Sequence, residues 1–283
     1  STIHDHVAAA RRRLREAGIS DDEAELDARL LAAHALGWTT AQYIESAQQL
    51  PPPAFTARFD GLIARRAARE PFAYIVGQQE FWGLAFEVTP AVLIPRPETE
   101  LLVELVLARC DRDEPARIAD VCTGSGCVAI AVARERPRAG IDATDISEAA
   151  LDVAKRNAAR HDVASRVAWK NVDLLDGLSG PFDVIVANPP YVAGRDRPTL
   201  QPEVVDHEPG VALFAGDDGM DVIRRLLPQA AALLRTGGTL LFEFGFGQDA
   251  AVADLISSTR SLKMIDLRRD LAGIPRAAVA IRG

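Results

Sequence analysis

An asparagine, two prolines and a tyrosine, Asn188-Pro189-Pro190-Tyr191, stand directly after a short apolar run. The run, Phe182–Ala187, is β-branched at its centre and predicts a buried strand, which the prolines end because each ring fixes φ and removes an N–H. The Asn188 side-chain oxygen and the Pro189 carbonyl can then each accept one hydrogen of a planar NH2 group. The Tyr191 ring can stack on its face. The motif predicts a site that holds an amide or amine nitrogen.

A glycine-rich turn stands between a second predicted strand and a helix. The strand is Ile118–Cys122, the turn is Thr123-Gly124-Ser125-Gly126, and the helix is Cys127–Arg136. Glycines let the backbone approach a ligand closely, and a helix N-terminus favours a carboxylate or phosphate. Asp145 follows a short strand, Gly140–Thr144, about 20 residues after the glycines, which is the spacing typical of an acid that binds a ribose diol.

The glycine loop by itself leaves two cofactors equally open. Gly124-x-Gly126-x-x-Ala129 fits the dinucleotide pattern of a dehydrogenase as well as the loop of an S-adenosylmethionine-dependent methyltransferase. The Asn188 motif decides between them. Hydride transfer has no use for a double-proline amide clamp, whereas methylation of an NH2 nitrogen does, so we expect S-adenosylmethionine and no binding of NADH.

The first 69 residues predict a small bundle of helices. The expected helices are Ile3–Ala17, Asp21–Leu36, Thr40–Ser46 and Phe55–Arg69, and their expected core positions include Leu26, Leu30, Leu31 and Ile44. From Phe72 the pattern becomes strand-like. Three short runs, Tyr74–Val76, Glu80–Trp82 and Leu84–Val88, predict a β-hairpin that joins the bundle to the remainder.

The remainder alternates strands with helices, which is typical of a parallel, doubly wound sheet. The expected strands are Arg117–Val121, Ile141–Thr144, Val167–Asn171, Phe182–Ala187, Thr239–Phe244, Lys263–Leu267 and Ala277–Ile281. The last two have too short a connection for a crossover helix, so we expect them to form an antiparallel hairpin. Ligands of such sheets bind at the carboxyl ends of the strands, where the strand order reverses.

Several segments call for a simpler interpretation. The polar stretch between Tyr191 and Met220 has little periodicity and begins at the expected site, so we interpret it as a substrate-binding lid. A lone histidine between two acids, Asp206-His207-Glu208, predicts hydrogen-bonded structure, and we expect no metal. Glu98 and Thr99 are expected to cap a helix over Glu98–Cys110.

Composition excludes some classes of partner. The 283 residues carry a net charge of −8, which argues against tight nucleic-acid binding because that binding is driven by cationic side chains. No apolar stretch approaches the roughly 20 residues of a membrane span, and the first residues lack the apolar core of a signal peptide. Three cysteines without zinc spacing favour free thiols in a reducing cytoplasm, so we expect a cytoplasmic location.

The whole pattern resembles one family closely. The runs Glu70–Gly83, Phe86–Pro90, Val92–Glu100, Asp120–Gly126, Ala187–Tyr191, His207–Leu213 and Asp218-Gly219 are similar, in order, to the peptide-chain release factor glutamine N5-methyltransferases. One departure is visible, because Cys122 stands where the family usually has glycine. Since cysteine is small, we expect the cofactor still to fit, with slightly less room beside it.

The resemblance implies a fold and a division of the chain. The fold would be α/β, a seven-stranded class I methyltransferase (Rossmann-like) sheet of strand order 3-2-1-4-5-7-6 with a small N-terminal helical bundle. We expect a helical substrate-recognition domain over residues 1–71, a β-hairpin linker over 72–92 and a methyltransferase domain over 93–283.

The resemblance also implies the roles of individual residues. Asn188, Pro189 and Tyr191 would be catalytic, and together with Pro190 they would bind the substrate amide. The expected cofactor-binding residues are Cys122, Thr123, Gly124, Ser125, Gly126, Asp145, Asp173, Leu174 and Asn188. Within this set the loop would hold the methionine part, and Asp173 with Leu174 would meet the adenine.

The implied activity is methyl transfer from S-adenosylmethionine, giving S-adenosylhomocysteine, to the glutamine of the Gly-Gly-Gln motif of release factors. Two alternatives use the same chemistry: a ribosomal-protein glutamine methyltransferase and, disfavoured by the acidic charge, a nucleic-acid adenine-N6 methyltransferase. We expect a monomer that acts on a protein and binds neither nucleic acid directly nor a membrane.

Overall fold

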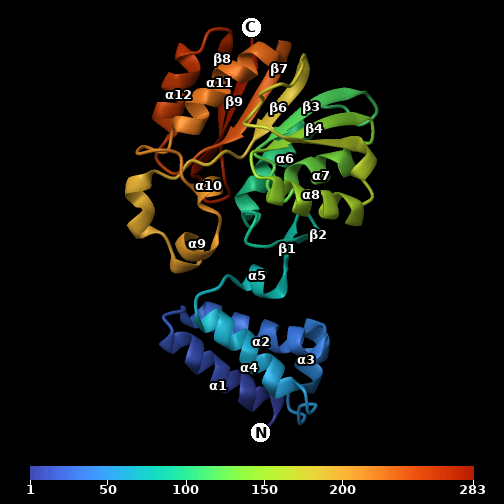
Figure 1. Ribbon diagram of the computed structural model, residues 1–283, viewed down its shortest axis with the longest axis vertical. Helices are drawn as coiled ribbons and strands as arrows, with labels where there is room; N and C mark the ends of the chain where they lie inside the picture. The colour runs from blue at the N-terminus through green and yellow to red at the C-terminus, as the bar shows by residue number, and fades with distance from the viewer. The chain divides into compact units, whose positions relative to one another are not determined.

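The computed structural model describes residues 1–283 and divides the chain into two compact units (Figure 1). The helical unit contains residues 1–78 together with 201–207, and the sheet unit contains residues 79–200 and 208–283. Each unit has its own apolar core, and no helix in either is long and apolar enough to cross a membrane.

The helical unit is built from amphipathic helices with well-defined ends. Its members are α1 (Ile3–Glu16), α2 (Asp21–Leu36), α3 (Thr40–Ser46), α4 (Phe55–Ala67), α5 (Phe72–Val76) and α9 (Pro202–His207). The side chains of Thr2, Ser20 and Thr39 accept hydrogen bonds from the first turns of α1, α2 and α3, which satisfies donors that have no partner within the helix. Helix α2 ends at Gly37, whose φ of 68° is left-handed.

The core of the helical unit differs in part from the expected one. Leu31 is fully buried, but Leu26 is 45% exposed and Ile44 is 69% exposed, so these two expectations are wrong. The buried stripe of α2 runs through Ala24, Ala28 and Leu31, at helical spacing, and a residue two positions from Ala24 lies on the opposite side of the helix. Most residues of this stripe are alanines, and choosing the most hydrophobic residues as core positions therefore overlooks them.

The segment before the hairpin is helical, not extended. Tyr74–Val76 was expected as a strand but belongs to α5, which follows Pro71 and ends at Gly77. A short apolar run fits either state, and here Tyr74 and Ile75 are buried, with Ile75 in the core of the helical unit. The hairpin itself is β1 (Gln78–Phe81) and β2 (Leu84–Glu87), joined by two residues of positive φ.

The seven-stranded sheet has the expected order. Its strands are β3 (Ala116–Val121), β4 (Ala139–Asp145), β5 (Val167–Asn171), β6 (Phe182–Ala187), β7 (Leu234–Glu243), β8 (Leu262–Arg269) and β9 (Pro275–Arg282). They lie side by side as β5-β4-β3-β6-β7-β9-β8. The first five are parallel, and β9 pairs antiparallel with both β7 and β8, which confirms the predicted terminal hairpin.

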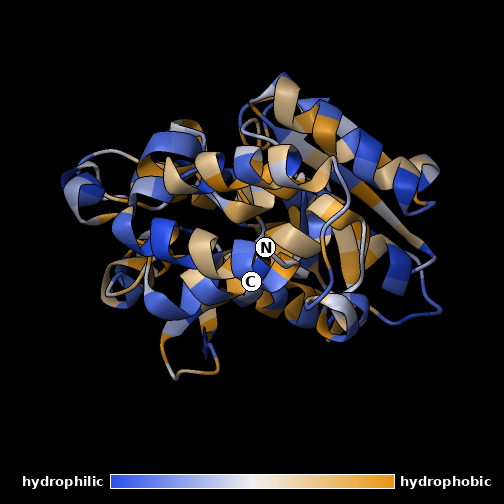
Figure 2. Cartoon of the chain, turned by 90° about the horizontal axis from the view of Figure 1, so that it is seen from below, coloured by the Kyte–Doolittle hydropathy of each residue, from blue (hydrophilic) through white to orange (hydrophobic).

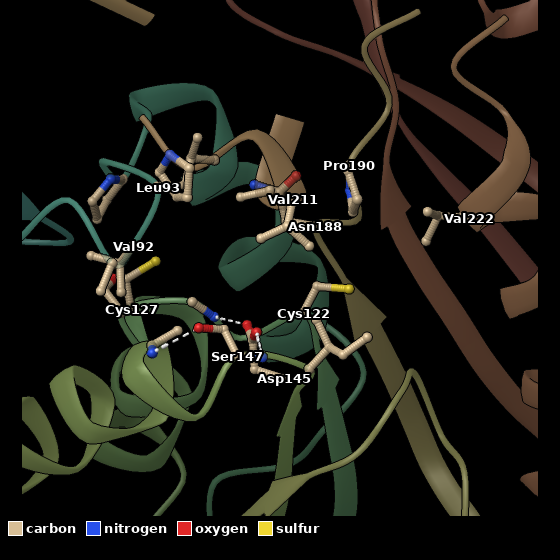
Figure 3. A pocket seen from close by; sticks show the side chains of 18 of the residues that line it. Val92, Leu93, Cys122, Cys127, Asp145, Ser147, Asn188, Pro190, Val211 and Val222 are labelled. Atoms are coloured by element: carbon tan, nitrogen blue, oxygen red, sulfur yellow. Dashed lines mark hydrogen bonds between the residues drawn. The ribbon is translucent and has the colours of Figure 1, made fainter. Parts of the chain in front are cut away.

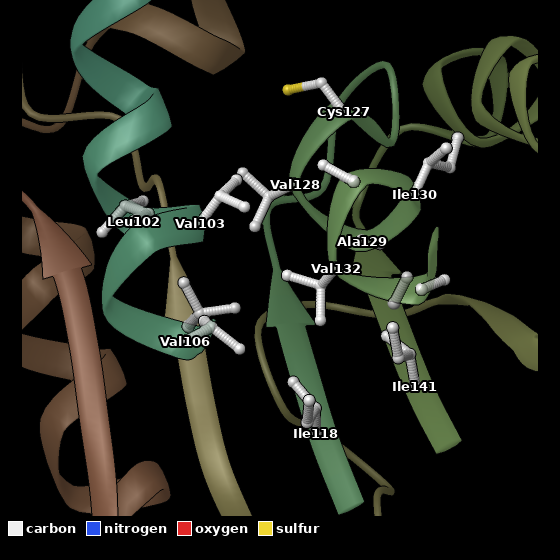
Figure 4. Close-up of a cluster of buried hydrophobic side chains, with 14 of the residues drawn as sticks. Leu102, Val103, Val106, Ile118, Cys127, Val128, Ala129, Ile130, Val132 and Ile141 are labelled. Atoms are coloured by element: carbon white, nitrogen blue, oxygen red, sulfur yellow. The ribbon is translucent and has the colours of Figure 1, made fainter. Parts of the chain in front are cut away.

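Helices cover both faces of this sheet. On one side lie α6 (Glu100–Leu107), α7 (Cys127–Glu135) and α8 (Glu148–Arg160); on the other lie α11 (Asp221–Leu233) and α12 (Asp249–Ser258). Side chains alternate accordingly, because Ile118 of β3 packs with the first layer and Ala119 with the second. Figure 4 shows Val103 of α6 facing Val128 of α7 above Ile118. The apolar and polar sides of the helices are visible in Figure 2.

The stretch between Tyr191 and Met220 is more ordered than expected. It contains a 3-10 helix, Gly194–Thr199, then α9, then α10 (Gly210–Leu213), and Val192 forms a parallel bridge with Phe214. Of this stretch, only residues 201–207 belong to the helical unit. The chain therefore leaves the sheet unit and returns to it within one excursion.

Buried charges hold α9 within the helical unit. The Arg66 guanidinium, 5% exposed, donates to Asp27 (2.6 Å) and to Glu203 (2.8 Å), and Arg69 donates to the second oxygen of Glu203 (2.7 Å). Burial raises the pKa of Asp27, while the hydrogen bond from Arg66 opposes that rise. The arginine therefore compensates two carboxylates that would otherwise be unpaired.

Arg66→Met should destabilise the protein by about 3 kcal/mol or more, because it leaves a buried carboxylate without its cation. Arg65→Met is the matched control, since Arg65 of the same helix is exposed and its pair with Glu70 is worth under about 1 kcal/mol. Urea unfolding gives the free energies, and hydrogen exchange of residues 201–207 localises the effect. Equal losses in the two variants would contradict the role given to Arg66.

Candidate active site

A cavity of about 220 Å³ lies where the carboxyl ends of the parallel strands meet (Figure 3). It is lined by Ala91, Val92, Leu93, Pro95, Arg96, Thr99, Cys122, Gly124, Ser125, Cys127, Asp145, Ile146, Ser147, Ala150, Asp173, Leu174, Asn188, Pro190, Pro209, Val211, Ala212, Phe214, Val222 and Arg225. The sheet order reverses between β3 and β6, and the glycine loop follows β3 while Asn188 follows β6. This is the position at which sheets of this kind bind ligands.

The glycine loop takes left-handed turns. Gly124 and Gly126 have φ of 56° and 80°, and a Cβ on Gly126 would lie 3.1 Å from Ala154, Ile130 and Trp169. Gly126 is therefore fixed by packing, whereas Gly124 lines the cavity. Cys122 also has a positive φ, 59°, a conformation that glycine adopts without steric cost.

A buried carboxylate supports this loop from below. Asp120, 2% exposed, accepts hydrogen bonds from the Thr123 hydroxyl (2.6 Å) and from the backbone N–H of Ala129 (3.1 Å) in the first turn of α7. Burial raises the pKa of Asp120 to about 7, although both hydrogen bonds favour the charged form. Thr123, expected to touch the cofactor, directs its side chain to Asp120 and does not line the cavity.

Asp145 stands at the end of β4 with both carboxylate oxygens in use. One accepts from the N–H of Gly124 (2.9 Å) and the other from the N–H of Ser147 (2.9 Å), and Ser147 caps α8 through a bond from Ala150. Burial raises the pKa of Asp145, and these backbone hydrogen bonds oppose the rise. A carboxylate oxygen can accept more than one bond, so Asp145 retains acceptor capacity toward the cavity.

Beyond β5, Asp173 and Leu174 line the same cavity, as expected from their position. Asp173 forms an ion pair with Arg225 of α11, a contact that the sequence did not suggest. Leu174 is 5% exposed and adds an apolar wall. The two residues together offer an acceptor and an apolar surface at this end.

Asn188 is oriented by a chain of hydrogen bonds. Its side-chain nitrogen donates to the Thr99 hydroxyl (3.2 Å), and Thr99 in turn donates to Glu243 at the end of β7 (2.8 Å). Thr99 is 2% exposed and gives no cap to α6, so the expected capping role is wrong. The Asn188 side chain lines the cavity beside Pro190, where Figure 3 shows both.

Tyr191 lies behind this wall and does not line the cavity. Its hydroxyl, for which no role was expected, donates to the second oxygen of Glu243 (2.9 Å). Burial and the charge of Glu243 raise the pKa of Tyr191 above its ordinary value. A Cβ on Gly245 would lie 3.1 Å from the Tyr191 ring, so the ring is held tightly.

Of the twelve residues expected at the site, eight line the cavity: Cys122, Gly124, Ser125, Asp145, Asp173, Leu174, Asn188 and Pro190. The other four, Thr123, Gly126, Pro189 and Tyr191, stand next to these in the chain without lining it. Sequence reasoning missed Glu243. An acid at the end of an apolar strand is the signal that selected Asp145, and it also marks Glu243.

A second wall of the cavity depends on Glu208. This carboxylate, 6% exposed, accepts a hydrogen bond from the N–H of Ile94 (3.1 Å) and forms an ion pair with Arg96. It thereby joins the segment around Pro95 to the residues before α10, both of which line the cavity. At the rim, Val211 exposes 58% of its surface.

The cysteines of the cavity are unreactive thiols. Burial raises the pKa of Cys127 to about 12 and raises that of Cys122 as well, so both stay protonated at neutral pH. All three cysteines of the chain are free. A covalent role for sulfur at this site has no support.

Comparison with known proteins places both parts of the chain. Residues 5–77 match the PrmC N-terminal domain, and residues 97–209 match the methyltransferase small domain. The release factor glutamine methyltransferase of Bradyrhizobium diazoefficiens is 42% identical over 97% of this chain and 94% of its own length. This chain belongs to the release factor glutamine methyltransferase family.

Other relatives agree with that membership. The release factor glutamine methyltransferase of Moorella thermoacetica is 43% identical over 99% of both chains. Among solved structures, a methyltransferase from Pyrococcus furiosus superposes with a TM-score of 0.55 at 18% identity, over 79% of this chain and 98% of that one. At that identity the likeness concerns the fold alone.

The raised pKa of Asp120 predicts a pH dependence of stability. The folded protein holds the carboxyl proton of Asp120 more tightly than the unfolded chain does. The stability that this proton adds to the folded state is therefore fully present below about pH 4 and is lost as pH rises through about 7. Asp120→Asn can still accept both hydrogen bonds and removes the titration. In urea unfolding, the free energy of unfolding of the variant relative to that of the native chain should rise by on the order of a few kcal/mol between pH 4 and pH 8. A difference that stays constant with pH would contradict the burial argument.

Proposed function

We propose that this chain transfers the methyl group of S-adenosylmethionine to the side-chain amide nitrogen of a glutamine in a peptide-chain release factor. The observation that carries the proposal is the Asn188 amide, which turns its nitrogen to Thr99 and leaves its oxygen without a partner in the protein, at a cavity formed by the cofactor-type loop. Family membership supports the same activity.

The residues of the cavity fit S-adenosylmethionine. The Ser125 hydroxyl is buried without a hydrogen-bond partner beside the N-terminus of α7, where a ligand carboxylate would meet unpaired donors. Asp145 has acceptor capacity for ribose hydroxyls, and Leu174 with Ile146 supplies apolar surface for a purine. When bound, the cofactor would supply an electrophilic methyl group on a sulfonium.

The protein's own part in the reaction is to hold a weak nucleophile. The nitrogen lone pair of an amide is delocalised into its carbonyl, so positioning and electrostatic stabilisation must supply the catalysis. Asn188 and the Pro189 carbonyl would accept the two N–H bonds of the glutamine, which aims the nitrogen and favours the positive charge that grows on it. Cys122, Gly124, Ser125 and Asp145 would hold the cofactor opposite.

No group with the pKa of a general base is required for this transfer. The nitrogen becomes acidic only as it gains the methyl group, and its proton can then leave to water. The Tyr191 ring lies behind the cavity wall, and its hydroxyl, bound to Glu243, fixes where the ring lies. Tyr191 would therefore support the wall that carries Asn188 and Pro190, and the stacking role expected for its ring is not part of this proposal.

The choice of substrate follows from the family and from charge. The helical domain over residues 1–71 would provide a surface for a large protein substrate. A net charge of −8 disfavours the adenine-N6 alternative. A ribosomal-protein glutamine would satisfy the same cavity, so the experiment must compare the two proteins.

The test incubates the enzyme with labelled cofactor and either a release factor or a preparation of ribosomal proteins, followed by tandem mass spectrometry. We expect one methyl group on the glutamine of the Gly-Gly-Gln motif. We also expect a far lower rate on the isolated tripeptide, because remote contacts contribute to orientation. Asn188→Ala should cut turnover by on the order of a hundredfold with cofactor affinity nearly unchanged.

The control is a release factor in which that glutamine is replaced by glutamate, which has no NH2 group and should take up no label. Methyl groups found on a ribosomal protein, with the release factor untouched, would overturn the substrate and leave the chemistry in place. Tight binding of NADH would overturn the cofactor.

A further inference from the structure

Glu243 is a buried carboxylate without a directly bonded cation. It ends β7, is 3% exposed, and its two oxygens accept from the hydroxyls of Thr99 and Tyr191. Arg276, a basic side chain whose charge lowers the pKa of Glu243, donates its own hydrogen bond to Asp270 (3.0 Å). Burying a charge with only neutral partners is costly, so an apolar residue would serve the fold better at this place.

Glu243 fixes which group donates and which accepts in the hydrogen bonds that lead from it to Asn188. Burial raises the pKa of Glu243, and the hydrogen bonds from Thr99 and Tyr191 oppose that rise because they favour the ionised form. In that form the carboxylate has no hydrogen to give, so the Thr99 hydroxyl donates its single proton to Glu243. Thr99 can then only accept from Asn188, and the atom of the Asn188 amide that faces it must be the nitrogen. The Asn188 oxygen is left on the other side of the amide, away from Thr99.

An asparagine without this constraint could turn its amide over. The flipped amide would present NH2 to the NH2 group of the substrate, and two donors facing each other cannot form a hydrogen bond. A supporting hydrogen bond that locks the side chain prevents this, as the partners of a ligating residue do elsewhere. The three residues come from distant parts of the chain. Asn188 and Glu243 meet because β6 and β7 are neighbours, and Thr99 joins them because α6, which it precedes, packs against both strands.

We infer that Glu243, acting through the Thr99 hydroxyl, is a positioning residue that fixes the Asn188 amide with its oxygen toward the substrate nitrogen. The inference rests on the proposed methylation of a glutamine amide. It assigns to a buried acid, and to a threonine in the cavity wall, a share in catalysis without contact with the reacting atoms.

The test is a double-mutant cycle between Thr99→Val and Asn188→Ala, measured by kcat and KM on release factor, with cofactor affinity by calorimetry. Thr99→Val removes the hydroxyl that accepts from Asn188 and should lower kcat by tenfold to a hundredfold, the range typical of losing a partner that orients a functional residue. Its cofactor affinity should stay within about twofold of the native value. In the Asn188→Ala background the same change should cost less than about twofold, because its effect passes through the missing amide.

Two further variants separate orientation from folding. Thr99→Ser keeps a hydroxyl and should recover most of the activity that Thr99→Val loses. Thr144→Val is the matched control, since the Thr144 hydroxyl is equally buried but has no partner, and its kcat should equal that of the native chain. Glu243→Gln removes the charge and lets either end of its own amide face Thr99, so its kcat should fall between those of the native chain and Thr99→Val.

The outcomes are distinct. Full additivity of Thr99→Val and Asn188→Ala, or native kcat in Thr99→Val, would overturn the positioning role. Melting temperatures of all variants identify a folding defect, and Thr99→Ala repeats the cycle if the valine variant does not fold. A native enzyme that does not methylate the release factor would instead refute the proposed substrate, and the cycle would then be run on the glutamine that it does methylate.

Discussion

Parallel pairing of β3 with both β4 and β6 is the constraint on which the site depends. Parallel strands end on the same edge, so the residues after β3, β4, β5, β6 and β7 must converge there. The order reverses between β3 and β6, which opens space between the glycine loop on one side and Asn188 on the other. Chemistry placed at strand ends needs no long-range loop to bring it together.

Buried acids then give this edge its shape. Asp120 holds the glycine loop against α7, Asp145 holds Gly124, Glu208 joins two segments of the opposite wall, and Glu243 holds Thr99 and Tyr191. Most of these carboxylates bond to backbone N–H or hydroxyl groups, and only Glu208 bonds to a basic side chain. Such contacts are directional, so they fix angles that apolar packing would leave free. Burying these acids is energetically costly, but it fixes the hydrogen-bond donors and acceptors of the cavity before a ligand binds.

Local patterns predicted the parts of the protein that local physics determines. The alternation of apolar strands and helices was enough to predict a parallel sheet and its strands, whereas the strand order came from the resemblance to the family. The glycine spacing was enough to find Asp145. Tyr74–Val76 was mistaken for a strand because a short apolar run fits either state, and burial of Tyr74 and Ile75 decides for the helix. The bond between Thr99 and Glu243 spans 144 residues of sequence, and no spacing rule reports such a contact.

The central claim is that the cavity orients a glutamine amide with its nitrogen toward Asn188 and Pro189. The most direct measurement is a crystal structure of the protein with S-adenosylhomocysteine and a release factor. The account predicts the glutamine side-chain nitrogen within about 2.7–3.2 Å of both the Asn188 side-chain oxygen and the Pro189 carbonyl. A glutamine whose carbonyl oxygen faces Asn188, or an Asn188 amide turned with its nitrogen toward the substrate, would contradict it.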